Sequence, residues 1–264
     1  MKYIDIHCHL DFSDYGSELP SVLGRMKERE VGAITIGTDL ASSERAVAIA
    51  EQNENIWACI GVHPVDNEKG ERVSFSENDF EKLISNPKVV AIGECGLDWF
   101  RIPAELLGQE KERQTEVFKQ QIEFALKHNK PLMLHCRESY DDALEILTAY
   151  KKQVGEKLRG NAHFFAGNMD QARKFLDLGF SMSFTGVVTF THDYDEVIKY
   201  LPIDSIMSET DAPFVAPVPY RGKRNEPSYV VEVAKKIAEI RGEREDVVCA
   251  QVLRNAQKMF GLSF

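Results

Sequence analysis

The stretch Tyr3-Ile4-Asp5-Ile6-His7-Cys8-His9-Leu10-Asp11 opens the chain with a predicted strand that carries two histidines with one residue between them. Because a β-strand turns alternate side chains to the same face, His7 and His9 would point together, and Cys8 would point to the other side. A His-x-His pair can hold a divalent cation, but it is about as often a chance pair on a solvated strand. The rest of the chain decides between these two interpretations.

Short apolar segments rich in β-formers alternate with longer amphipathic segments along the 264 residues. The eight predicted strands cover residues 3–9, 33–37, 56–62, 89–93, 131–136, 161–165, 180–184 and 205–209. Predicted helices cover 19–29, 42–52, 110–128, 139–150, 169–178 and 194–200, and two more follow the last strand at 226–240 and 244–260. Repeated alternation predicts a parallel sheet with right-handed crossovers, and eight units predict an α/β fold closed into a (β/α)8 TIM barrel.

The alternative fold is an open, doubly wound sheet. It is disfavoured because the first strand is not followed by the Gly-rich turn that binds dinucleotide phosphates. The length is typical of one barrel, and no internal repeat or Pro/Gly/Ser-rich linker divides the chain. We therefore expect a single domain over residues 1–264.

The composition narrows the class of protein further. No segment approaches the roughly 20 apolar residues that span a bilayer, and the first residues lack the apolar run of a signal peptide. Five cysteines, an odd number, suit reduced buried thiols, so we expect a cytoplasmic protein without a membrane partner. The net charge of −10 disfavours a broad surface that coats nucleic acid, so any such contact would be local.

Six potential metal ligands fall at the carboxyl ends of predicted strands, where a barrel gathers its functional groups. They are His7, His9, Glu94, His135, His163 and Asp211. Each one alone could cap a helix or meet solvent, but six on one rim predict a metal centre. The set exceeds the ligands of one catalytic ion, so we expect two divalent ions, Zn²⁺, Mn²⁺ or Mg²⁺, with Glu94 as the candidate bridge. Such an ion pair supports hydrolysis.

The long segment 214–227 carries Arg221, Lys223 and Arg224, which would form a positive patch near the metals and attract phosphate. The alternative is a solvated run of charges. Asn225 is a candidate to donate an amide N–H to a phosphate or sugar oxygen, or else to cap the helix that begins near residue 226.

Other polar and aromatic residues are predicted on the same rim. His63 would donate to a phosphate oxygen when protonated, or would be an ordinary hydrogen-bonded histidine, and Arg137 is a further phosphate candidate. Glu209 is a candidate to orient a ligand histidine or a water molecule. Trp99 and Phe100 would stack on an unpaired base, although aromatic residues there more often serve packing.

Several motifs recur at these positions: Asp-Ile-His-Cys-His-Leu-Asp at 5–11, Gly-Val-His-Pro at 61–64, Gly-Glu-Cys-Gly-Leu-Asp at 93–98, His-Cys-Arg at 135–137, Glu-Thr-Asp-Ala-Pro at 209–213 and Arg-Gly-Lys-Arg-Asn-Glu-Pro at 221–227. Together they resemble the TatD family of metal-dependent deoxyribonucleases, within the amidohydrolase-like group of metal barrels. The resemblance runs end to end. Its most specific elements are the last two motifs, because His-x-His is common to the whole group.

The resemblance implies a (β/α)8 barrel with two divalent ions that hydrolyses phosphodiester bonds of DNA, as an exonuclease on single-stranded or frayed ends. By the resemblance, one ion would be held by His7, His9 and Asp211, and the other by His135 and His163, with Glu94 between them. Asp211 would orient or deprotonate the attacking water. The candidate catalytic residues are Asp211, Glu94 and Glu209.

The chain departs from the family pattern at two places. The sixth strand commonly reads His-Cys-Phe-Ser-Gly in the family, whereas Phe164 and Ala166 stand at the second and fourth of these positions here. The missing serine hydroxyl would alter substrate contacts. Cys95 stands where the family more often has an aliphatic residue, and its place beside a metal ligand predicts sensitivity to oxidation.

Two other functions stay open at this point. The same barrel could hydrolyse an amide, a lactone or an ester, because activated water also attacks carbonyl carbon. In such enzymes a carboxylated lysine often bridges the metals, and Glu94 in that place favours the phosphodiesterase. The protein could also be a non-catalytic, metal-dependent binding module, which the retained base Asp211 disfavours. The sequence leaves the oligomeric state open, a monomer included.

Overall fold

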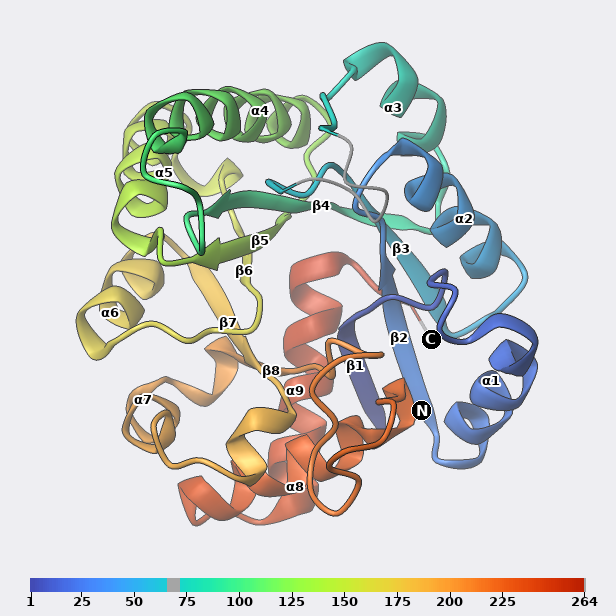
Figure 1. The fold of residues 1–264 in the computed structure, drawn as a ribbon. Coiled ribbons are helices and arrows are strands. Elements are labelled where there is room, and N and C mark those ends of the chain that lie inside the picture. Colours follow the sequence, from blue (N-terminus) through green and yellow to red (C-terminus); the bar gives the residue numbers. More distant parts are fainter. Residues whose placement is uncertain (66–71, 264) are drawn as a thin grey trace.

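The strands form one parallel sheet in the order β1 to β8, each paired with the next along the chain (Figure 1). The computed structural model describes residues 1–65 and 72–263. Its strands are β1 (Tyr3–Cys8), β2 (Val31–Ile36), β3 (Ile56–Ile60), β4 (Val89–Asp98), β5 (Leu132–Arg137), β6 (Gly160–Ala162), β7 (Phe180–Phe184) and β8 (Ile206–Ser208). The fold is the predicted (β/α)8 TIM barrel.

Helices α1 to α8 surround the ring of strands in Figure 1, and α9 is seen within the outline of the ring. They are α1 (Leu19–Glu28), α2 (Leu40–Glu51), α3 (Glu77–Ile84), α4 (Leu107–Lys127), α5 (Tyr140–Val154), α6 (Met169–Asp177), α7 (Asp195–Tyr200), α8 (Val230–Arg241) and α9 (Glu245–Phe260). Helix α3 was not among the predicted helices; it is only eight residues long and buries Phe80 and Ile84. In the described part of the chain, no helix is both long and apolar enough to cross a membrane.

The barrel closes where the first strand meets the segment after the last one. Cys8 pairs with Ala212 in a parallel bridge, and the His9 N–H donates to the Ala212 carbonyl at 2.8 Å. The Asp211 N–H donates to the His7 carbonyl at 2.9 Å. Closure therefore brings Asp211 beside the two histidines, although about 200 residues separate them along the chain.

The local sequence explains why these segments adopt their structure. Every residue of β2 and β3 is buried, as expected for parallel strands that are covered on both faces. Helix α2 begins with a capping box, in which the Asp39 carboxylate accepts the Ser42 N–H and the Ser42 hydroxyl accepts the Asp39 N–H. Such caps determine the residue at which a strand-to-helix loop ends, and therefore help to position the loops at the carboxyl ends of the strands.

Two strands differ from their predicted ranges near the site. Strand β4 continues to Asp98, five residues beyond the predicted end, and Gly96 allows this because a Cβ there would lie 2.0 Å from the His135 carbonyl oxygen. Strand β6 ends at Ala162, so His163 follows the strand instead of lying within it. The backbone leaves the extended conformation there, since Phe164 has a φ of 44°.

Candidate metal centre

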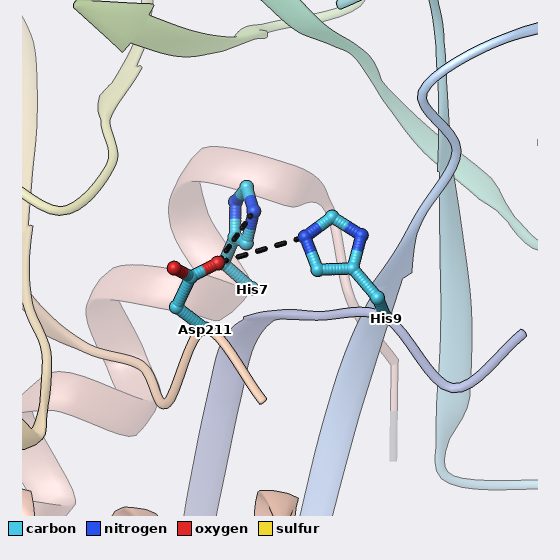
Figure 2. Close-up of side chains that lie close together, drawn as sticks. All are labelled: His7, His9 and Asp211. Atoms are coloured by element: carbon cyan, nitrogen blue, oxygen red, sulfur yellow. Dashed lines mark ion pairs between the residues drawn. The ribbon is translucent and has the colours of Figure 1, made fainter. Parts of the chain in front are cut away.

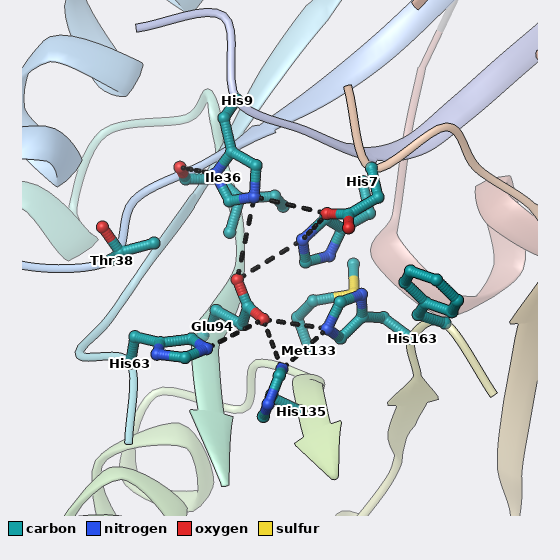
Figure 3. A network of polar contacts seen from close by, with 12 residues as sticks. His7, His9, Ile36, Thr38, His63, Glu94, Met133, His135 and His163 are labelled. Atoms are coloured by element: carbon teal, nitrogen blue, oxygen red, sulfur yellow. Dashed lines mark hydrogen bonds and ion pairs between the residues drawn. The ribbon is translucent and has the colours of Figure 1, made fainter. Parts of the chain in front are cut away.

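The predicted ligands converge around Glu94, as Figure 3 shows for His7, His9, His135 and His163, and Asp211 lies beside His7 and His9. One carboxylate oxygen, Glu94 Oε1, lies 2.8 Å from His135 Nδ1 and 2.8 Å from His163 Nε2. The other oxygen, Oε2, lies 3.4 Å from His7 Nε2 and 3.9 Å from His9 Nε2. The two oxygens of one carboxylate therefore face two different pairs of imidazoles.

Asp211 completes the group on the side of the first strand. Its Oδ1 lies 3.6 Å from His7 Nε2 and 3.5 Å from His9 Nε2, as Figure 2 shows. His7, His9 and Asp211 thus form one compact set of three ligand atoms. This is the grouping that the resemblance implied for one ion.

In His9, His135 and His163, the imidazole nitrogen that faces away from the centre lies near a group that would fix the tautomer. His9 Nδ1 lies 3.2 Å from the Ile36 carbonyl oxygen, and His135 Nε2 lies 3.1 Å from Asp98 Oδ2. His163 Nδ1 faces Glu209 Oε1 at 3.6 Å. Metal-binding histidines usually donate their second N–H to a carbonyl or carboxylate, because this leaves the inner lone pair free for the ion.

The residues present fit a divalent cation. In the described part of the chain, both ring nitrogens of buried His7 lack a hydrogen-bond partner, which is costly unless something else satisfies them. His135 Nδ1 and His163 Nε2 lie 3.2 Å apart, so two lone pairs would repel there unless a proton or a cation lies between them. Imidazoles and carboxylates together are the ligands that Zn²⁺ and Mn²⁺ accept.

The electrostatics of the centre favour ionised carboxylates. Burial alone would raise the pKa of Glu94, but the surrounding imidazoles, His163 foremost, hold it well below its usual range. Burial also opposes ionisation of Asp211, yet the hydrogen bond with His9 and the nearby His7 keep its pKa low. For His163, the carboxylate of Glu94 outweighs burial and raises the pKa well above its usual value. A bound divalent cation would compete with the proton that this raised pKa keeps on His163.

Glu209 lies fully buried beneath the centre. Its carboxylate accepts the Phe164 N–H at 2.5 Å and the Ser183 hydroxyl at 2.9 Å, in addition to facing His163. Ser183 in turn accepts a hydrogen bond from the Asn161 amide at 2.6 Å. These contacts place Glu209 behind His163, so of its two predicted tasks the orientation of a ligand histidine fits its position better.

Two carboxylates that the sequence interpretation did not assign also support the centre. Asp98, 5% exposed, hydrogen-bonds His135 on the side away from Glu94. Asp5, fully buried, accepts the His7 N–H at 3.2 Å and the N–H of Thr210 at 2.9 Å, and so ties β1 to the segment after β8. Asp5 lies two residues before His7, and Asp98 lies four residues after Glu94. Each therefore lies on the same strand face as a predicted ligand, a relation that the alternation of side chains along a strand makes visible in the sequence.

A cavity of about 640 Å³ opens above the centre. His63 and Arg137, two candidates for contact with a phosphate, both line it. His63 Nε2 lies 3.4 Å from Glu94 Oε1, and its Nδ1 accepts the Val65 N–H at 3.2 Å, so a neutral His63 carries its proton on Nε2. The guanidinium of Arg137 lies 3.5 Å from the centre of the Phe100 ring.

The predicted basic patch lies elsewhere. Within the described residues, the cavity lining includes none of Arg221, Lys223, Arg224 and Asn225. Arg224 donates to Glu18 at 2.8 Å and to the Asp14 carbonyl at 2.7 Å, so its charge is already paired. Arg221 stacks on Phe190 at 3.6 Å, and Lys223 is exposed. The contact of these cations with substrate stays a prediction.

Asn225 is buried and uses its side chain to brace its own loop. The amide donates to the Thr210 carbonyl at 2.9 Å and to the Phe214 carbonyl at 2.6 Å, and its oxygen accepts the Glu226 N–H at 2.9 Å. Both amide hydrogens are thus engaged, which leaves none for a substrate. The short helix that follows, η5 (Pro227–Tyr229), has Glu226 and not Asn225 at its N-cap.

The remaining sequence features fall into place around the cavity. Phe164 and Ala166, the departures from the family pattern, both line it. Trp99 is occupied with Asp142, to which its indole N–H donates at 2.8 Å. Cys95 is fully buried, where burial raises the pKa of its thiol well above the usual value and so disfavours the reactive thiolate.

Known proteins resemble this chain over its full length. A family model described as "TatD related DNase" matches residues 4–261. The uncharacterized metal-dependent hydrolase YabD of Bacillus subtilis is 37% identical, covering 98% of this chain and 99% of YabD, and YcfH of Escherichia coli, with the same description, is 32% identical, covering 98% and 96%. The crystal structure of YjjV, a TatD homolog from Escherichia coli, matches with a TM-score of 0.88 at 27% identity, covering 99% of both chains. The chain belongs to the TatD-related DNase family of metal-dependent hydrolases.

Proposed function

We propose that this chain is one domain that hydrolyses phosphodiester bonds of DNA, as an exonuclease on single-stranded or frayed ends, with two divalent ions bound among its six converging ligands. Membership of the TatD-related DNase family supports a DNA-like substrate. The cavity above the centre, about 640 Å³, has room for a nucleotide unit.

The observation that carries the proposal is the position of Glu94. Its Oε1 faces His135 and His163 and its Oε2 faces His7 and His9, so Glu94 would hold two divalent cations together with these histidines. Two such ions, when bound, would neutralise the charge that develops on the attacking and leaving oxygens of a phosphodiester and lower the pKa of the attacking water.

The protein's own groups would handle the protons. Asp211 borders the cavity with a lowered pKa, so it is ionised at neutral pH and can accept the proton of the attacking water. Burial lowers the pKa of His63, so this side chain is neutral and would donate from Nε2 to a phosphoryl oxygen. This differs from the protonated donor that the sequence suggested.

The test uses purified protein, Mn²⁺ or Mg²⁺, and end-labelled single-stranded DNA. We expect progressive shortening of the oligonucleotide that EDTA abolishes. Asp211→Asn should reduce the rate by roughly 10²- to 10⁴-fold, as expected when a group that accepts a proton is lost. Asp193→Asn, an exposed carboxylate between β7 and α7, is the matched control and should retain the full rate.

The same preparation should be offered lactones, carboxylic esters and amides. If the metal-loaded protein leaves every oligonucleotide intact but hydrolyses one of these carbonyl substrates, the nuclease proposal is wrong and the alternative hydrolase is correct. Tight metal binding without turnover of any substrate would instead identify a binding module.

A further inference from the structure

One wall of the cavity is aromatic, although the centre beside it is entirely polar. Phe12, Phe214 and Val215 line the cavity next to His9 and Asp211. The Phe12 ring stacks on the His9 ring with centroids 4.5 Å apart, and the Phe214 ring meets Phe12 edge to face at 6.0 Å. A phosphate would contact only the polar groups of the metal centre, so the aromatic wall has no role in binding a phosphate.

Phe214 is both exposed and held in place. It is 49% exposed, among the largest values for a large apolar side chain in the described residues. Its carbonyl accepts the buried amide of Asn225, and its N–H donates to the Asp211 carbonyl at 2.9 Å. Because hydrogen bonds hold the backbone of Phe214 three residues after Asp211, only its side-chain rotamer would have to become ordered when a ligand binds.

We propose that Phe214, backed by Phe12, forms a subsite for the unpaired base of the nucleotide whose phosphate lies at the metal centre. The inference rests on the proposed function. In a nucleotide, a flat apolar base is covalently joined to the phosphate through one sugar, and this cavity joins an apolar wall to a phosphate-binding floor in the same way. The wall has no charged side chain, so it suits the neutral ring of a base.

This arrangement selects the state of the DNA end. The last base of a blunt duplex has one free face, but pairing holds that base to the opposite strand, so only an unpaired base can turn out of the helix and stack on Phe214. Stacking is tolerant of sequence because every base has a π-face. The subsite would therefore favour single-stranded or frayed ends without preferring one base.

The test compares two oligonucleotides that differ only in whether the terminal nucleotides carry bases or are abasic. For release of the first nucleotide, Phe214→Ala should raise the KM for the normal oligonucleotide about tenfold, the size of one base–aromatic stack, and leave the KM for the abasic one unchanged. Phe214→Trp should retain the normal KM, and Phe214→Leu should not. Tyr200→Ala, which removes a 46% exposed ring from α7, is the control and should change neither substrate.

A second readout does not depend on cleavage. An oligonucleotide with terminal 2-aminopurine should lose fluorescence on binding to the wild-type protein, because stacking quenches this base, and should lose much less with Phe214→Ala. An equal effect of Phe214→Ala on normal and abasic oligonucleotides would overturn the subsite while leaving the nuclease proposal intact. If the wild-type protein cleaves neither, the proposed function fails, and unquenched 2-aminopurine would then overturn the subsite as well.

Discussion

Asp98 fixes the orientation of one imidazole at the centre. Its Oδ2 lies 3.1 Å from His135 Nε2, and its Oδ1 accepts the Phe100 N–H at 2.8 Å, so the carboxylate is itself held. Burial opposes its ionisation, but the hydrogen bond with His135 keeps the pKa of Asp98 below its usual value. An ionised Asp98 would keep the proton of His135 on Nε2 and leave Nδ1 for a metal ion.

We therefore expect Asp98→Asn to weaken metal binding about 10- to 100-fold, since a neutral amide does not stabilise this tautomer in the same way. The measurement is the Mn²⁺ concentration that gives half-maximal DNA hydrolysis, together with calorimetric titration of the metal-free protein. Asp79→Asn on α3, an exposed carboxylate paired with Lys82, is the control. An unchanged Mn²⁺ requirement in Asp98→Asn would show that Asp98 does not act through His135.

The alternation of a strand explains which site residues the sequence revealed. His7 and His9, two residues apart, were assigned to one face from that alternation, and Figure 3 shows them on the same centre. Asp98 lies four residues after Glu94 on β4 and so on the same face. Because the predicted strand ended at residue 93, the sequence interpretation did not place these two residues on one face. Polar residues at the end of β4 look like a loop, because strand patterns are recognised from apolar residues.

At the scale of elements, helix α4 forms hydrogen bonds through two buried glutamines with the segment after β3 and with the end of β4. Gln121 accepts the Val62 N–H at 2.8 Å and donates to the Val62 carbonyl at 2.9 Å. Gln114, two turns earlier on the same face, makes the same pair of bonds with the backbone of Asp98, at 2.8 and 3.1 Å. The helix thus sets the positions of the residues that precede His63 and support His135.

Gln121→Leu keeps the volume but leaves the N–H and carbonyl of Val62 without these partners. We expect it to lower the free energy of unfolding by at least roughly 1–3 kcal/mol, the cost of one buried unsatisfied polar group, since two such groups lose their partner. Gln120→Leu is a matched control on the same helix, because the Gln120 amide donates to Glu116 at the surface and its loss should change stability by less than about 0.5 kcal/mol. Urea unfolding followed by circular dichroism measures the free energy of unfolding of both variants. Equal losses would show that the hydrogen bonds between Gln121 and Val62 do not stabilise the fold.

The segment after β8 shows what the sequence could not predict. Its basic residues were expected at the metal centre, but Arg224 pairs with Glu18, about 200 residues earlier in the chain. A charge pattern reveals how many cations a loop carries but not which distant carboxylates fold against it. The buried Asn225 illustrates the same limit, since an asparagine that braces a loop has the same sequence signature as a helix cap.

At the scale of the whole molecule, the fold was predictable because closure follows from the number of strand–helix units. Each strand needed only to be recognised approximately, since parallel pairing of successive strands fixes their order. The metal centre followed from the same rule, because every carboxyl end faces one rim. The rule does not show how far each side chain reaches, so the aromatic wall and the supporting carboxylates needed coordinates.

The pH dependence of stability would report whether the converging groups form a cation site. In the metal-free protein, the pKa of His163 is raised above its ordinary value of 6.5, so its protonated form stabilises the fold. This contribution is fully present below pH 6.5 and is lost as pH rises through the raised pKa. Burial lowers the pKa of His7 and His63, so their contributions change only below pH 6.5. The pKa values of His9 and His135 are also raised, because neighbouring carboxylates outweigh burial, so these two histidines add to the loss of stability above pH 6.5.

We therefore expect the thermal midpoint of EDTA-treated protein to fall as pH rises above 6.5. Metal ions compete with protons for the same nitrogens, so the stabilisation by added Mn²⁺ should increase over the same range. Thermal unfolding of wild-type and His163→Gln protein, each with EDTA and with Mn²⁺, separates this effect from other titrating groups, because the variant in EDTA should show a flatter profile. His192→Gln, which removes an exposed histidine paired with Asp195, should behave as wild type. If wild-type and His163→Gln midpoints run parallel in EDTA, protonation of His163 does not stabilise the metal-free protein, and the raised pKa inferred for this residue is wrong.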